Sequence, residues 1–254
     1  MLHTDDMLAG RYRLDKRVGG GGMGDVWRGE DTLLRRTVAI KMLLPNLSDE
    51  RNFRERFHRE ACAIASLEGP SVVDVYDYGE VEGPRGLLAF LVMQYVDGQS
   101  LSRRLGGWGR LNSQDTLQVV AQVADALQTA HDVGIIHRDV KPGNILVRDD
   151  GHVVLVDFGI ARTSADLTMT TTGVVLGTVT YMSPEQASGE RLSPASDVYS
   201  LGVVAHQCLA GDPPFKADTP LGVLSAHLRN DPPRLPADVP HPVPELISRA
   251  MSKD

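Results

Sequence analysis

Residues 19–24 read GGGGMG, and these five glycines restrict the fold of this 254-residue chain more than any other feature. Glycine loses more backbone entropy on ordering than any other residue, so the run indicates a place where backbone is needed without side chains. A phosphate-binding loop, a dinucleotide-binding fingerprint and a flexible linker are all compatible with it. The glycines alone do not distinguish these interpretations, so the residues after them decide.

Those following residues exclude the dinucleotide-binding interpretation. Such a fingerprint runs from a strand into a helix, with an acidic residue about 20 residues later. Here the glycines lead into a strand candidate at 24–30, and the next strand candidate contains TVAIK and its Lys41. A Walker A loop is excluded as well, because no Gly-Lys-Ser/Thr closes the run.

Composition and charge indicate an ordinary folded chain. Apolar residues make up 42% and charged residues 23%, and the length suits one large domain or two small lobes. The net charge of −7 argues against a general affinity for nucleic acid or anionic lipid. Cys62 and Cys208 lack metal-ligand spacing, so both are expected to be reduced core residues, with a disulfide between them as the alternative.

The sequence contains no targeting or membrane signal. No apolar run approaches the roughly 20 residues of a membrane span. The start, MLHTDDMLAG, lacks the apolar core of a signal peptide. We therefore expect a cytoplasmic chain with no membrane segment and no nucleic-acid partner.

The first third of the chain is predicted to form a β-rich lobe with one helix. In that helix Phe53, Phe57, Ile64 and Leu67 recur near one face. Period-2 patterning and glycine boundaries give the strand candidates, which are 11–18, 24–30, 36–43, 72–79 and 87–96.

The remainder is predicted to be helical. Residues 113–132 have strong helical periodicity with Ser113 as the expected N-cap, and Asp150-Gly151 marks a tight turn. The expected architecture is α+β and bilobal. The small lobe covers 11–93, a hinge covers 94–98, and the larger helical lobe covers 99–254.

Three further motifs follow the glycines in a fixed order. They are IIHRDVKPGNIL at 135–146, VDFGIAR at 156–162 and GTVTYMSPEQA at 177–187. With the glycine run and Lys41, this set resembles the signature motifs of protein kinases over nearly the whole chain. Within the protein kinases, the segments GGMGDVW, DFGIAR, SPEQA and ASDVYSLG resemble those of bacterial eukaryotic-like (Hanks-type) Ser/Thr kinases. In particular, the chain resembles the catalytic domain of actinobacterial PASTA-type receptor kinases and their close relatives.

The resemblance implies transfer of the γ-phosphate of ATP to Ser/Thr hydroxyls of proteins, with Mg²⁺ or Mn²⁺ as the metal. Asp139 would then be the catalytic base, and Lys141 would steady the transferring phosphate. Lys41 would meet the α- and β-phosphates with Glu60 as its partner; Glu50 and Glu55 are the alternatives. The other reading of Glu60 is an ordinary surface glutamate.

Asn144 and Asp157 are the implied metal ligands, because hard oxygen donors suit Mg²⁺. Each of the two, and Asp139 as well, could instead be a turn-forming Asx residue. The resemblance also implies a slot for the adenine ring, lined by Val18, Val26, Ala39 and Leu146, with Met93 as the gatekeeper before the hinge. For these apolar residues, packing in the core is the alternative. The ATP-binding set is Val18, Gly19, Gly21, Gly24, Val26, Ala39, Lys41, Met93, Gln94, Val96, Asp97 and Leu146.

The segment from Asp157 to Glu185 resembles an activation segment. We expect autophosphorylation of Thr170 and Thr172, with one phosphate docking on Arg138. The alternative is a polar loop that needs no modification. By resemblance Thr178 braces the substrate site, Glu185 belongs to the APE-like motif, and Asp197 is the buried acid that holds the catalytic loop.

The chain stops at AMSKD, before the arginine that relatives place opposite the residue matching Glu185, so a C-terminal truncation is expected. Relatives often continue to a membrane span, so this chain could be the cytoplasmic domain of a longer anchored kinase. Similar kinases also form homodimers through the small lobe. A kinase-like binding module without activity is the competing class, but Lys41, Asp139, Asn144 and Asp157 are all retained.

Overall fold

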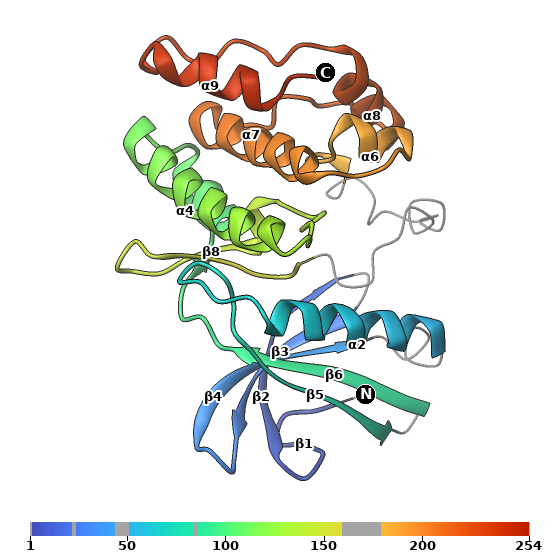
Figure 1. Ribbon diagram of the computed structural model, residues 1–254. Helices are drawn as coiled ribbons and strands as arrows, with labels where there is room; N and C mark the ends of the chain where they lie inside the picture. Colours follow the sequence, from blue (N-terminus) through green and yellow to red (C-terminus); the bar gives the residue numbers. More distant parts are fainter. Residues whose placement is uncertain (1, 22–23, 44–50, 84–85, 159–178, 254) are drawn as a thin grey trace. The chain divides into compact units, whose positions relative to one another are not determined.

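The computed structural model describes residues 2–21, 24–43, 51–83, 86–158 and 179–253 (Figure 1). The chain divides into two compact units. The first comprises Met1–Glu68 and Val73–Asp97, and the second comprises Gly69–Val72 and Gly98–Asp254. Four residues between the two segments of the first unit therefore belong to the second.

The first unit is a six-stranded antiparallel sheet accompanied by one long helix (Figure 1). The strand order is β1-β2-β3-β4-β6-β5. Its elements are β1 (Met7–Leu8), β2 (Tyr12–Gly21), β3 (Gly24–Asp31), β4 (Arg36–Leu43), α2 (Arg51–Ala65), β5 (Val75–Gly83) and β6 (Gly86–Gln94). The predicted lobe of strands with one helix is confirmed within the described residues.

Alternation along the strands gives the first unit its core. Trp27 on β3, Ile40 on β4 and Val92 on β6 point to one face and belong to a buried cluster that also contains Tyr12 and Phe90. Phe53, Phe57 and Ile64 on α2, and Leu67 just beyond its end, were predicted to share a face, and all four are buried. That face packs against β5.

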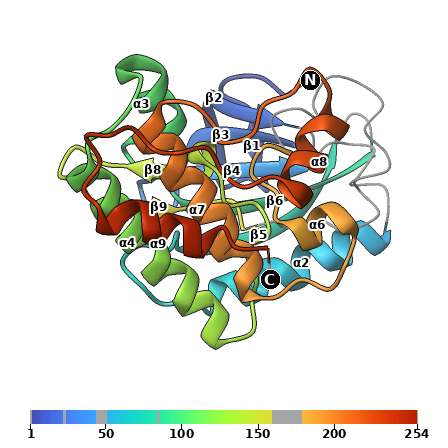
Figure 2. The ribbon, with the colours of Figure 1, turned by 90° about the horizontal axis from the view of Figure 1, so that it is seen from above.

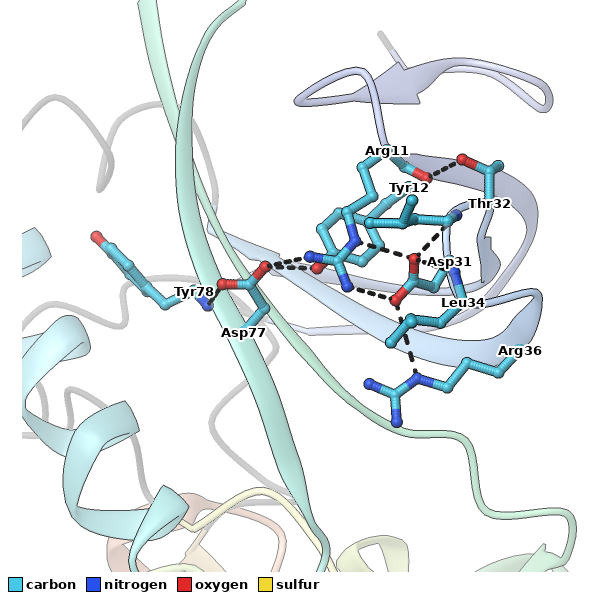
Figure 3. A network of polar contacts seen from close by, with 9 residues as sticks. Arg11, Tyr12, Asp31, Thr32, Leu34, Arg36, Asp77 and Tyr78 are labelled. Carbon is cyan, nitrogen blue, oxygen red and sulfur yellow. Dashed lines mark hydrogen bonds and ion pairs between the residues drawn. The ribbon is translucent and has the colours of Figure 1, made fainter.

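A network of polar contacts joins residues at β2, β3 and β5 of this sheet (Figure 3). The Arg11 guanidinium makes two hydrogen bonds to Asp31, at 2.9 and 2.7 Å, and reaches Asp77 at 3.5 Å. The hydroxyl of Tyr12 donates to the same Asp77 carboxylate. Arg11 holds the pKa of Asp31 below its usual value, so the carboxylate stays charged.

The second unit is mostly helical, with a small three-stranded sheet of order β7-β8-β9. Helices α4, α7 and α9 form its centre, where α7 packs against both of the others (Figure 2). Its elements are β7 (Gln99–Ser100), α3 (Leu101–Trp108), α4 (Ser113–Asp132), η1 (Pro142–Asn144), β8 (Ile145–Val147), β9 (Val153–Leu155), α6 (Pro184–Ser188), α7 (Pro194–Ala210), α8 (Pro220–Arg229) and α9 (Pro242–Ala250).

Helix α7 is the most deeply buried helix of this unit. A capping box of Ser193 and Ser196 starts it, Pro194 occupies the first turn, and Gly211 ends it at φ 90°. Nearly every residue from Ser196 to Leu209 is buried. A helix that is buried all round can carry a polar residue inside only if that residue is bonded there.

Several sequence-based expectations need correction. The N-cap of α4 is Asn112, whose Oδ1 accepts from the Asp115 N–H at 2.8 Å, and not Ser113. Residues 72–74 are not part of a strand; Val72 instead forms an isolated bridge with Leu155. Residues 95 and 96 also lie beyond β6.

The two cysteines differ. Cys208 is buried on α7, and burial raises the pKa of its thiol to about 12. Cys62 is exposed on α2, so its expected core position was wrong. Both are free thiols, as predicted. Among the described residues no helix is both long and apolar enough to cross a membrane.

Candidate active site

A buried carboxylate on α7 holds the loop that precedes β8. Asp197 is 1% exposed, and its Oδ2 and Oδ1 accept the backbone N–H groups of His137 and Arg138, both at 2.8 Å. The Nε2 of His131, on α4, lies 2.8 Å from Oδ2. Two backbone donors some 60 residues earlier thus converge on one side chain. Asp197 therefore fixes the path of residues 137–138.

This loop contains a strained residue. Arg138 has φ 67°, in the left-handed region that non-glycine residues seldom adopt. Its N–H is held by Asp197, and its carbonyl accepts from Gln186 Nε2 at 2.9 Å. Such strain persists only where the surroundings over-determine the backbone, which is typical of functional loops.

His137 is a structural residue inside the loop. It is completely buried, and its ring lies 4.6 Å from that of Phe158. Nδ1 accepts the Asp139 N–H at 3.2 Å, so Nε2 carries the proton and donates to the Val156 carbonyl at 3.1 Å. Burial lowers the pKa of His137, which agrees with this neutral tautomer.

The loop brings three predicted site residues together. Lys141 Nζ lies 2.8 Å from Asp139 Oδ2, and Asn144 Nδ2 donates to the same oxygen at 3.1 Å. Asn144 Nδ2 also donates to the Asp139 carbonyl at 2.9 Å. Asp139 is therefore held in one orientation by two side chains of its own loop.

The orientation of the Asn144 amide follows from its partners. Both groups that it contacts on Asp139 are acceptors, so the nitrogen faces them and the oxygen Oδ1 points elsewhere. The Asn144 carbonyl accepts from the Val156 N–H at 2.9 Å, which brings the start of the 157 segment beside η1. Asp157 itself has φ 55°, a second strained position. The two predicted metal ligands thus lie on adjoining backbone segments of one unit.

In the first unit, the register of the sheet places four of the predicted residues on one face. Lys41 on β4 is paired with Val26 on β3, and Ala39 is paired with Met93 on β6. Opposite residues share a face, and so do residues two apart, so these four side chains lie on the face opposite the Trp27 cluster. Lys41 is only 9% exposed, which is unusual for a lysine.

The glycines of the hairpin have different structural demands. A Cβ on Gly24 would lie 1.7 Å from the Met42 carbonyl oxygen, so the β3–β4 pairing itself requires glycine there. A Cβ on Gly19 would meet only the Val26 Cβ, at 3.9 Å. Gly21 is paired with Gly24 at the end of the hairpin. The strand pairing alone therefore explains the glycine at position 24, whether or not a nucleotide binds there.

The remaining predicted residues are placed individually. Glu60 is half-buried on α2, Val18 is exposed on β2, and Val96 and Asp97 follow β6, buried and exposed respectively. The N–H of Gln94 donates to the Asp74 carbonyl at 2.8 Å. In the second unit Leu146 is half-buried on β8, and Glu185 is half-buried in the first turn of α6. Thr170, Thr172 and Thr178 lie outside the described residues.

Sequence reasoning missed two residues that support this loop. His131 contacts Asp197 from α4, and Gln186 holds the Arg138 carbonyl from α6. Gln186 also forms a capping box with Ser183, and this Ser-x-x-Gln pattern was visible in the sequence. Nothing local to His131 distinguished it from the other histidines.

Comparison with known proteins agrees with this arrangement. The family model described as "Protein kinase domain" matches residues 12–253. Serine/threonine-protein kinase PknA of Mycobacterium tuberculosis is 46% identical over 248 residues, which cover 97% of this chain and 58% of PknA. PknA of Corynebacterium glutamicum is 42% identical over 98% of this chain and 53% of its own length.

A third relative gives the same result. Serine/threonine-protein kinase PknB of Mycolicibacterium smegmatis is 42% identical over the whole of this chain and 41% of its own length. The chain thus spans about half the length of these curated relatives. The predicted α+β protein kinase fold and the predicted relationship to actinobacterial Ser/Thr kinases are both confirmed. This chain belongs to the protein kinase family, as a domain of the bacterial eukaryotic-like Ser/Thr type.

Proposed function

We propose that this chain transfers the γ-phosphoryl group of ATP to Ser/Thr hydroxyls of proteins and acts in bacterial signalling. The observation that carries the proposal is the group of Asp139, Lys141 and Asn144, held in one orientation by a loop anchored on the buried Asp197. A binding module without activity would not need this arrangement around Asp139.

Asp139 is the group that accepts or orients the hydroxyl proton of the protein substrate. Its carboxylate is positioned by Asn144 and by Lys141, so little reorganisation is needed when the hydroxyl arrives. Lys141 carries a positive charge 2.8 Å from that carboxylate, where it also steadies the transferring phosphate.

ATP and a divalent metal ion are the cofactors of this family, and we propose Mg²⁺ or Mn²⁺ here. Bound metal would neutralise phosphate charge and orient the γ-phosphoryl group. The residues fit such an ion, because Asn144 turns its amide oxygen away from Asp139 and Asp157 supplies a carboxylate on the adjoining segment. These two residues would hold it.

Residues of the first unit, together with Leu146 of the second, are proposed to bind ATP. Lys41 contacts the α- and β-phosphates and Glu60 positions it, while the hairpin backbone at Gly19, Gly21 and Gly24 covers the phosphates. Support comes from the sheet face that Lys41 shares with Val26, Ala39 and Met93. The proposed adenine and ribose contacts are Val18, Val26, Ala39, Met93, Gln94, Val96, Asp97 and Leu146.

The boundaries of the lobes remain our proposal: a small lobe at 11–93, a hinge at 94–98 and a large lobe at 99–254. The division of the compact units after Asp97 supports a boundary in this region. A cytoplasmic location is proposed with it, either for the chain alone or as part of a longer anchored kinase.

Activation-segment phosphorylation is proposed at Thr170 and Thr172, with one phosphate docking on Arg138. Support comes from the fixed backbone of Arg138, which places a cation next to Asp139. Phosphopeptide mass spectrometry of active protein should find at least one of the two threonines modified. Active protein with neither site modified would exclude the idea.

A homodimer through the first unit is also proposed. Leu33 and Leu34, between β3 and β4, are 73% and 57% exposed. Arg11 and Asp77 nearby are both partly exposed, and such a pair of opposite charges is self-complementary about a two-fold axis (Figure 3). Sedimentation velocity should detect a dimer that a Leu33→Ser, Leu34→Ser double variant loses. An unchanged monomer–dimer balance would contradict it.

The main experiment measures transfer of labelled γ-phosphate from ATP, with Mg²⁺ or Mn²⁺, to the chain itself and to a generic basic protein. Asp139→Asn should reduce the rate by about 10²- to 10⁴-fold, and Lys41→Met should also reduce it strongly. Asp149→Asn and Lys16→Met, at exposed positions, are the matched controls. Equal labelling in all five proteins would overturn the mechanism.

A further inference from the structure

The segment Val179–Ser183 is held from two helices. Its Thr180 carbonyl accepts from His227 Nε2 on α8 at 2.9 Å. Its Tyr181 carbonyl accepts from Ser200 Oγ on α7 at 2.7 Å. Apolar packing of Val179 against Val223 of α8 adds to these bonds. Both the backbone and the side chains of this segment are therefore attached to helices that begin more than ten residues later in the chain.

The hydrogen bonds around His227 have only one consistent direction. A carbonyl can only accept, so Nε2 carries the ring proton and donates to Thr180. Nδ1, 3.0 Å from the Tyr199 hydroxyl, must then accept the hydroxyl proton. The Tyr199 oxygen in turn accepts from Lys253 Nζ at 2.7 Å. The chain of donors runs from Lys253 through Tyr199 and His227 to the Thr180 carbonyl.

The surroundings of His227 keep its imidazole neutral, as this series of hydrogen bonds requires. His227 is completely buried, and burial lowers its pKa to about 4. Lys253 lies 4.8 Å from the ring centroids of both Tyr199 and Phe215, and its ammonium also donates to the His227 carbonyl at 2.6 Å. The Phe215 ring packs edge-on against His227 at 4.9 Å. Ring contacts and hydrogen bonds thus fix the imidazole on both sides.

The same segment is connected to the candidate active site at its other end. Ser183 caps α6 and is bonded to Gln186, and Gln186 Nε2 holds the carbonyl of Arg138, next to Asp139. The backbone from Thr180 to Gln186 therefore extends from the His227 anchor to the loop that carries Asp139. A displacement at Thr180 would be transmitted along this short stretch.

We propose that His227 is a positioning residue for the protein substrate, acting by fixing the Thr180 carbonyl and hence the backbone beside Asp139. The proposal rests on the proposed kinase function. His227 touches neither Asp139 nor the predicted ATP-binding residues in the described structure, so its loss should weaken use of the protein substrate more than use of ATP. Tyr199 and Lys253 support it through the hydrogen bonds described above.

The test compares His227→Leu, which removes the donor, with His227→Gln, whose amide can still donate to the Thr180 carbonyl. His206→Leu is the matched control, because His206 is a second buried histidine of the same unit that contacts a carbonyl, that of Pro233, at 3.0 Å. Steady-state kinetics give KM for a peptide substrate and KM for ATP separately. Melting temperatures and hydrogen exchange of residues 179–183 are measured in parallel.

We expect His227→Leu to raise the peptide KM by about tenfold, the effect of losing one well-placed hydrogen bond, with KM for ATP within about twofold. His227→Gln should recover most of that loss. His206→Leu should lower the melting temperature without raising the peptide KM. Exchange in residues 179–183 should increase only in His227→Leu.

Other outcomes would overturn the assignment. If His227→Leu and His206→Leu change the peptide KM equally, or if KM for ATP rises as much, His227 is only a stabilising core residue. Faster exchange at residues 179–183 with an unchanged peptide KM has the same meaning. Absence of phosphate transfer by the unaltered chain would instead overturn the proposed function itself, so the two failures are distinguishable.

Discussion

The two units position their site residues by different physical means. In the first unit, Lys41 and Ala39 reach a common face through strand alternation and antiparallel register. In the second unit, Asp139 lies on an irregular loop whose backbone is held by Asp197, from a helix that starts more than 50 residues later. One arrangement is regular and local in character, and the other depends on one long-range polar anchor.

This difference predicts where each unit is sensitive. A sheet face tolerates many changes as long as register is kept, because the pleat decides which way each side chain points. A loop held through one buried carboxylate loses its path when that carboxylate loses its charge or its shape. Four changes test this difference between the two units.

Removing the anchor should have the largest effect. Asp197→Ala leaves the N–H groups of His137 and Arg138 without their acceptor, which should cost about 3 to 5 kcal/mol of unfolding free energy. Phosphate transfer should fall about a hundredfold or more because Asp139 is displaced. Urea titration and labelled-phosphate transfer measure the two effects. Asp238→Ala, an exposed carboxylate paired with Arg110, is the control and should change stability by less than about 1 kcal/mol.

Lowering the pH should weaken the second unit before the first. Burial lowers the pKa of His137, His206 and His227, the last to about 4, so these rings are neutral when folded and gain protons on unfolding. Their contribution is present above the ordinary histidine pKa of about 6.5 and is lost as the pH falls below it. For His227 alone the loss at pH 5 is about 2 kcal/mol.

In the first unit the group with a lowered pKa is a carboxylate, which titrates at a lower pH than a histidine. Arg11 lowers the pKa of Asp31, whose contribution is lost only when the pH falls below the ordinary carboxyl value of about 4. Hydrogen exchange followed at pH 7, 6 and 5 should therefore show faster opening in the second unit first. His227→Gln should flatten part of this pH dependence. Equal stability of the second unit at pH 7 and pH 5 would contradict the prediction.

Within the first unit, glycine substitutions test register against loop flexibility. Gly24→Ala should destabilise the unit by about 1 to 3 kcal/mol, because the new Cβ would collide with the Met42 backbone. Gly19→Ala should stay within about 0.5 kcal/mol, since its Cβ has ordinary space. Thermal unfolding without nucleotide separates this effect from ATP binding. Similar losses in both variants would mean that the hairpin register is different.

The smallest effect concerns a helix cap. Asn112→Ala should cost about 1 kcal/mol, because Asn112 caps α4 by accepting the Asp115 N–H. Ser113→Ala, one residue into the helix, should change stability by no more than about 0.5 kcal/mol. Thermal melts of the two variants give the comparison directly. A larger loss for Ser113→Ala would restore the original sequence-based assignment of the cap.

Many elements were predictable because their signals are local. The helix at 113–132 was placed with the correct bounds from periodicity, and the buried face of α2 from the spacing of its apolar residues. The α4 cap was misplaced by one residue, since Asn112 and Ser113 are both good capping types. The exposed position of Cys62 was missed because free cysteine is usually buried.

The residues of the candidate site likewise divide into those with local sequence signals and those without. Asp139, Lys141 and Asn144 lie within six residues of one another, and the motif that contains them was recognisable from residue types and order alone. Asp197 was anticipated through resemblance. Its partner His131 and the Thr180–His227 contact were not, because each joins residues whose spacing carries no pattern.

The sequence by itself determined the family, the order of the motifs and the residue types available for phosphoryl transfer, since these follow from local patterns and chemistry. Tertiary structure alone decided that Gly24 is required by the backbone of Met42, and that a series of hydrogen bonds from Lys253 through Tyr199 and His227 ends on the Thr180 carbonyl. The physical reason is that close approach and hydrogen-bond direction depend on distances between remote segments. Such distances exist only once the chain has folded.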